Sequence, residues 1–77
     1  MYKMVSYYRA DTSRYPANAR IIQVTPHLYA LYITHDVVGV VYYRKGCLLD
    51  LEKQFFSFIP YGHTRSIFWK KVKSNGD

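Results

Sequence analysis

The amino-acid sequence predicts an α+β fold: an antiparallel sheet of four to five strands with one amphipathic helix, about residues 47–59, packed on one face. Short β-branched and aromatic runs alternate with turn residues, and a single segment has helical periodicity. A chain of 77 residues supports one core, so we expect residues 1–77 to form a single compact domain. The alternative architecture is a small SH3-like barrel capped by the helix.

The amino-terminal third predicts two strands joined by the longest loop. Residues 2–9 alternate between two faces, as a strand does. Residues 11–19 contain turn formers and Pro16, and resemble a flexible binding loop. Residues 20–25 are β-branched and predict the second strand.

Residues 26–35 fit two structures. A helix starting at Pro26 has the expected proline position, and it would keep helical spacing for Leu28, Leu31, Tyr32 and His35. However, its first turn lacks an acid, and residues 28–34 are apolar on every side. We therefore favour a strand that turns back at residues 25–27.

Residues 37–44 give the clearest strand, in which Gly39 predicts a bulge or a close approach by another segment. Residues 47–59 then change to helical periodicity and stop at Pro60. Glu52 falls within the apolar stripe of this helix, where it either points past the sheet edge or pairs with an Arg or a Tyr hydroxyl.

Residues 60–66 predict a turn, and residues 66–73 predict a final edge strand protected by lysines. Residues 74–77 are expected to fray.

The charge balance favours a polyanionic partner. Eleven Lys and Arg against five acids give a net charge of +6 and a pI near 9.6. The segment 61–73 contains Arg65, Lys70, Lys71 and Lys73 without an acid, so we expect these cations to gather on one exterior patch. The alternative is an ordinary solvated face.

Nine tyrosines are unusual in a chain of this length. The triplet Tyr-Tyr-Arg occurs at residues 7–9 and again at 42–44. Neighbouring residues of a strand face opposite ways, so one tyrosine of each pair should lie in the core and the other should be exposed. An exposed tyrosine beside an arginine can stack on a base or anchor a protein contact.

We therefore expect a small, basic, non-enzymatic module that engages nucleic acid or a nucleoprotein. Cations would neutralise phosphates, and Tyr43, Tyr61 or Trp69 would stack on bases. The candidate binding residues are Arg44, Lys45, Tyr43, Tyr61, His63, Arg65, Trp69, Lys70, Lys71 and Lys73.

The sequence gives little support for metal binding, for a cysteine nucleophile or for a membrane-spanning segment. No metal or other cofactor is expected, because the three histidines and the cysteine share no metal-site spacing. Cys47, at the helix start, is expected to be a small buried apolar side chain and not a nucleophile. A lone cysteine also suggests a reducing, cytoplasmic location. The longest apolar run, residues 37–43, is too short to cross a membrane, and the first residues lack a secretory signal pattern.

Two other functions remain open. One is a small interaction protein, of the kind found in phages and mobile elements, that docks on and inhibits or regulates a larger machine such as a defence nuclease complex. The other is a metal-free ribonuclease using Tyr61, His63 and Arg65 with a carboxyl-terminal lysine. Homodimerisation through the edge of the first or last strand is compatible with a binding function.

Overall fold

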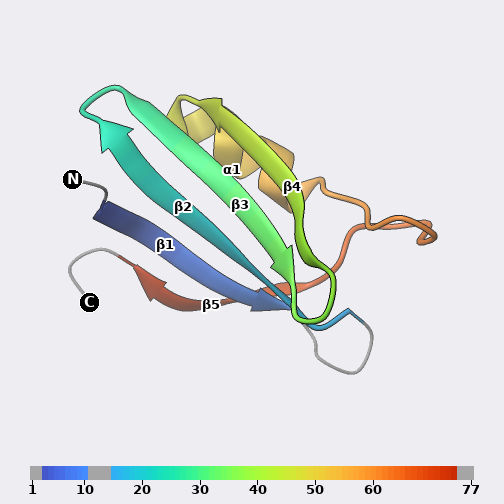
Figure 1. The fold of residues 1–77 in the computed structure, drawn as a ribbon. Coiled ribbons are helices and arrows are strands. Elements are labelled where there is room, and N and C mark those ends of the chain that lie inside the picture. Colours follow the sequence, from blue (N-terminus) through green and yellow to red (C-terminus); the bar gives the residue numbers. More distant parts are fainter. Residues whose placement is uncertain (1–2, 11–14, 75–77) are drawn as a thin grey trace.

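The computed structural model describes residues 3–10 and 15–74, with the side chains of residues 73 and 74 left undescribed. The strands are β1 (Lys3–Ala10), β2 (Ala17–Thr25), β3 (Leu28–His35), β4 (Gly39–Gly46) and β5 (Trp69–Ser74), and α1 (Leu48–Phe56) lies between β4 and β5 in the chain. They form an open antiparallel sheet in the order β4-β3-β2-β1-β5 (Figure 1). The predicted α+β fold is confirmed, and the barrel alternative is wrong because the sheet does not close.

The core lies between α1 and one face of the sheet. Phe55 is fully buried, and its ring centroid lies 4.5 Å from that of Tyr8 in β1 and 5.0 Å from that of Trp69 in β5. Three buried alanines of β1 and β2 belong to the same core cluster as these rings. These buried alanines are Ala10, Ala17 and Ala19.

The helix is shorter at its carboxyl end than its periodicity predicts. It ends at Phe56, and Ser57 is the C-cap residue, with φ −97° and ψ 4° and a hydroxyl that donates a hydrogen bond to the Lys53 carbonyl at 2.9 Å. Phe58 lies beyond the helix, with its ring centroid 5.3 Å from that of Tyr42. Cys47 precedes the buried stripe as the N-cap and is exposed, so the prediction that it is buried is wrong.

The strand predictions hold with shifted boundaries. Residues 26–35 contain strand β3, which pairs with both β2 and β4. β2 starts at Ala17, inside the predicted loop, while residues 11–14 of that loop lie outside the described part, as do residues 1–2 and 75–77. β5 starts at Trp69, three residues later than expected, because residues 66–68 do not pair with β1.

Two further expectations need correction. Gly39 has φ +99°, and no atom lies within 4 Å of the place where a Cβ would be, so the predicted close approach is wrong, while the pairing of β3 with β4 does shift nearby, between Ile33 and Thr34. β1 lies between β2 and β5, so the first strand offers no edge for dimerisation; the edges of the described sheet belong to β4 and β5.

Glu52 is half-buried, and no described residue donates a hydrogen bond to it.

The buried phenylalanine should contribute most of the stability that α1 adds. We expect Phe55→Ala to lower the free energy of unfolding by about 3–5 kcal/mol, because it removes the ring that joins the helix to β1 and β5. Phe56→Ala is the matched control, since Phe56 is 53% exposed and should cost less than half as much. Urea denaturation followed by circular dichroism measures both values, and equal losses would contradict this account of the core.

Candidate functional site

The candidate site lies on the face of the sheet opposite α1. In Figure 1 the helix lies behind the sheet, and within the described part of the chain no element covers the near side. We call this side the open face. Its residues alternate along each strand with those that face α1, so they follow directly from the burial pattern and the register.

One row of side chains crosses the open face at the same height on neighbouring strands. Tyr7 of β1 pairs with Arg20 of β2, Arg20 pairs with Tyr32 of β3, and Tyr32 pairs with Tyr43 of β4. Each directly opposed pair of residues projects to the same side of the sheet. We call Tyr7, Arg20, Tyr32 and Tyr43 the tyrosine–arginine row.

The row offers both aromatic surface and positive charge. The ring centroids of Tyr32 and Tyr43 lie 4.7 Å apart, and the Tyr43 side chain is 38% exposed. Arg20 is exposed between the buried residues Ala19 and Ile21, which fixes its direction away from the core. An aromatic ring at one end of the row and a guanidinium near its centre can bind a base and a phosphate at the same time.

More cations lie on either side of this row. Lys45 of β4 is exposed opposite Ala30, and Lys70 of β5 is exposed opposite Arg9. The open face is therefore basic towards both edges of the sheet.

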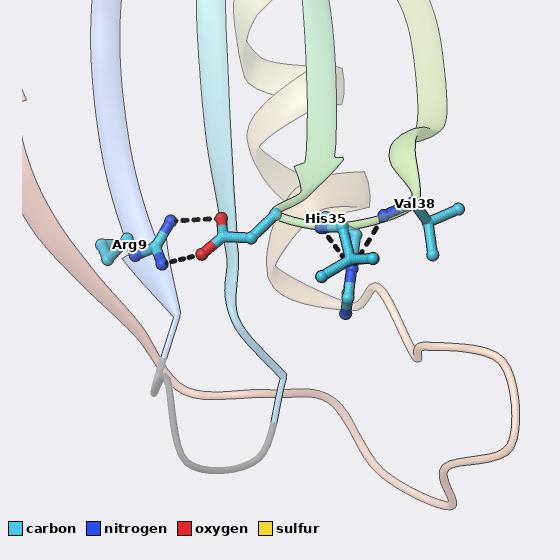
Figure 2. Close-up of polar contacts among 5 residues, drawn as sticks. Arg9, His35 and Val38 are labelled. Atoms are coloured by element: carbon cyan, nitrogen blue, oxygen red, sulfur yellow. Dashed lines mark hydrogen bonds and ion pairs between the residues drawn. The ribbon is translucent and has the colours of Figure 1, made fainter.

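Arg9 is held by an acid at one end of the open face. Its guanidinium donates two hydrogen bonds to the Asp36 carboxylate, at 2.8 Å and 2.5 Å (Figure 2). The Asp36 backbone is fixed in turn, because its N–H donates to the Pro16 carbonyl at 2.8 Å. Hydrogen bonding to Arg9 lowers the pKa of the Asp36 carboxyl below its ordinary value.

His35 stabilises the turn that carries Asp36. Its Nδ1 accepts hydrogen bonds from the backbone N–H groups of Val37, at 3.1 Å, and Val38, at 3.2 Å (Figure 2). Nδ1 therefore acts as a hydrogen-bond acceptor in this turn. The His35 ring also lies edge-on to Tyr15, with 4.8 Å between the centroids.

A pocket lies next to Tyr15. It is lined by Tyr15 and residues 62–68 and has a volume of about 670 Å³. Gly62 has φ +85°, and the His63 N–H donates to the Pro60 carbonyl at 3.0 Å, which closes a tight turn at the start of this wall. The Tyr15 and His63 ring centroids are 5.5 Å apart. Burial raises the pKa of the Tyr15 hydroxyl above its ordinary value.

The structure divides the candidate residues chosen from the sequence among several places. Tyr43, Lys45 and Lys70 share the open face, whereas Arg44 faces the helix side and stacks over the Tyr42 ring at 4.8 Å. Lys71 pairs with Tyr8, whose ring packs against Phe55, so Lys70 and Lys71 point to opposite faces. The expected single patch of carboxyl-terminal cations is thus divided.

The remaining candidates lie outside the open face. Trp69 is 7% exposed beside Phe55, so its ring is not available to stack on a base. Tyr61 is fully exposed in the segment between α1 and β5, and His63 and Arg65 line the pocket. The backbone of Lys73 pairs with Tyr7, and its side chain lies outside the described part.

Sequence reasoning did not select Tyr7, Arg20 or Tyr32 as site residues. One signal was available, because Arg20 interrupts the apolar alternation of Ala17, Ala19 and Ile21 at a position that must face the other way. The tyrosines could not be assigned to one surface without knowing which strands pair and in which register.

Comparisons with protein-family models, curated proteins and solved structures give no match to this chain. In the part of the chain that the structure describes, no helix has the length and apolar character needed to cross a membrane. Over the same residues, His, Cys, Asp and Glu side chains form no group of three or more that could hold a metal ion.

The Arg9–Asp36 pair predicts a pH dependence of stability. Because the Asp36 pKa is lowered by folding, its contribution is present above about pH 4 and is lost as the pH falls through the folded-state value. We expect the urea midpoint of the wild type to fall relative to that of Asp36→Asn between about pH 5 and pH 2. In an Arg9→Met background the same substitution should show no such difference, and a persisting difference would exclude the pair as its cause.

Proposed function

We propose that this protein binds single-stranded nucleic acid on the open face, as a binding module without catalytic activity. The observation that carries the proposal is the tyrosine–arginine row, which places Tyr7, Arg20, Tyr32 and Tyr43 in one line across a face that no described element covers. Unpaired bases stack on such rings, and the neighbouring cations bind phosphates.

The shape of the surface favours single strands over a duplex. A sheet several strands wide is too broad for the major groove, which admits a helix or a two-stranded ribbon. Base faces are hidden within a duplex but are available in a single strand. Open sheets with aromatic side chains on one face and helices on the other bind single-stranded RNA in this way in other proteins.

The chemistry of the open face also favours binding over catalysis. General acid–base catalysis needs an acid and a base that both reach the reacting atoms of the substrate. The described side chains of this face are mainly tyrosine, arginine, lysine and small residues, and the carboxylate at its end is occupied by Arg9. These groups are suited to holding a strand through stacking and charge.

Salt dependence should identify the cations that contact phosphate. Arg20, Lys45 and Lys70 together predict a slope of roughly −2 in log affinity against log salt, at about 0.7 per phosphate contact. We expect Lys70→Ala to reduce this slope by about 0.7 and to weaken all sequences similarly. Fluorescence anisotropy with a labelled oligonucleotide, at several salt concentrations, measures the slope.

Lys71→Ala is the matched control, since it removes the same charge from the next residue of β5 but from the other face. We expect it to leave the slope unchanged. If Lys70→Ala and Lys71→Ala weaken binding equally, the open face is not the binding surface.

Stacking should be tested at the exposed end of the row. We expect Tyr43→Leu to weaken oligonucleotide binding about 5- to 150-fold, because base–aromatic stacking is worth about 1–3 kcal/mol. Leucine retains apolar contact with Tyr32, so the variant should stay folded. Tyr61→Ala is the control, because it removes a fully exposed tyrosine outside the sheet. Failure of the wild type to bind single strands at low salt would contradict the proposal and favour docking on a protein instead.

A further inference from the structure

The pocket beside Tyr15 combines two kinds of wall. Tyr15 and Phe68 provide aromatic surface, and Phe68 is 79% exposed, so much of its ring is free to be covered by a ligand. His63 and Arg65 provide nitrogen donors, with the hydroxyl groups of Thr64 and Ser66 between and beside them. None of the described residues that line the pocket is acidic.

The pocket is much larger than a single ion. A volume of about 670 Å³ lies in the range of sites for small organic ligands, and a single phosphate would leave most of it to water. A ligand that uses both walls must carry a flat ring and an anionic group. A guanidinium binds phosphate oxygens in a bidentate manner, and aromatic side chains stack on bases.

The pocket also lies next to the end of the open face. Tyr15 contacts His35, and the carbonyl of the next residue, Pro16, accepts the hydrogen bond from the backbone of Asp36. Asp36 in turn binds Arg9 on the open face. One short turn therefore separates the Arg9 end of the open face from the Tyr15 wall of the pocket.

We infer that the pocket between Tyr15 and residues 62–68 binds a nucleoside monophosphate, with Arg65 and His63 on the phosphate and Phe68 against the base. The nucleotide is either free or the terminal residue of a strand. Binding of a terminal nucleotide rests on the proposed function, because the rest of that nucleic-acid strand would lie on the open face.

Isothermal titration of the full chain with a nucleoside monophosphate, the matching nucleoside and inorganic phosphate tests the pocket itself. The monophosphate should bind at least tenfold more tightly than either part. Arg65→Ala should remove this advantage, while Arg65→Lys should keep part of it because a lysine is a less specific phosphate ligand. Phe68→Ala should weaken the monophosphate and the nucleoside, but leave phosphate binding unchanged.

Arg44→Ala is the charge-matched control, since Arg44 stacks on Tyr42 away from the pocket. It should leave nucleotide binding unchanged. The inference is overturned if the monophosphate binds no better than phosphate, or if Arg65→Ala and Arg44→Ala have the same effect.

Oligonucleotides of one sequence with a 5′-phosphate, a 3′-phosphate or no terminal phosphate distinguish the two sources. A terminal nucleotide in the pocket predicts tighter binding of one phosphorylated form, and Arg65→Ala should abolish the difference. Equal affinity for the three, together with binding of the mononucleotide, identifies the free nucleotide as the ligand. Tyr43→Leu should weaken oligonucleotides but not the mononucleotide, so failure of the open face and failure of the pocket give different results.

Discussion

The antiparallel register of four consecutive strands is the constraint on which the other features of this surface depend. Pairing of β1 with β2, β2 with β3 and β3 with β4 brings Tyr7, Arg20, Tyr32 and Tyr43 to the same height, although they are far apart in the sequence. A slip of one residue in any strand would move its side chains to the other face and break the row. The register shift between Ile33 and Thr34 lies beyond this row, so Tyr32 and Tyr43 stay directly paired on the open face, while Tyr42, opposite Ile33, contacts the helix side by ordinary alternation.

The one-sided core explains why a small domain contains so many tyrosines. α1 has nine residues and covers one face of the sheet. The other face has no helix over it, so its side chains must be compatible with contact with water. Tyrosine suits both situations, because its ring provides packing area and its hydroxyl can remain hydrated. Tyr8 and Tyr42 pack towards the helix, whereas Tyr7 and Tyr43 point away from it. The two Tyr-Tyr-Arg triplets thus each supply one tyrosine to each face, as alternation predicts.

Local sequence pattern was sufficient to predict the elements, but not how they pair. The helical period identified α1, and β-branched runs identified most strands, because both signals depend on neighbouring residues only. The end of the helix was missed because Ser57 caps it three residues before Pro60. Of the candidate residues predicted for their charge or ring character, Tyr43, Lys45 and Lys70 lie together on the open face. Trp69 was chosen for the same reason, yet its partner Phe55 is set by tertiary packing, which local pattern does not encode.

The Arg9–Asp36 pair limits how much charge the open face can offer to a polyanion. A carboxylate that accepts two hydrogen bonds from a guanidinium occupies the geometry that a phosphate would need. A strand must therefore displace Asp36 from Arg9 or use the other exposed cations of the open face, Arg20, Lys45 and Lys70. Since displacement would release a carboxylate beside the incoming phosphate, the second route is favoured electrostatically. The turn that holds Asp36 is itself fixed by His35 and Pro16, so this acid is a permanent part of the surface. It withholds the Arg9 guanidinium from a bound strand and leaves Arg20, Lys45 and Lys70 to contact phosphate, although Lys70 lies directly opposite Arg9.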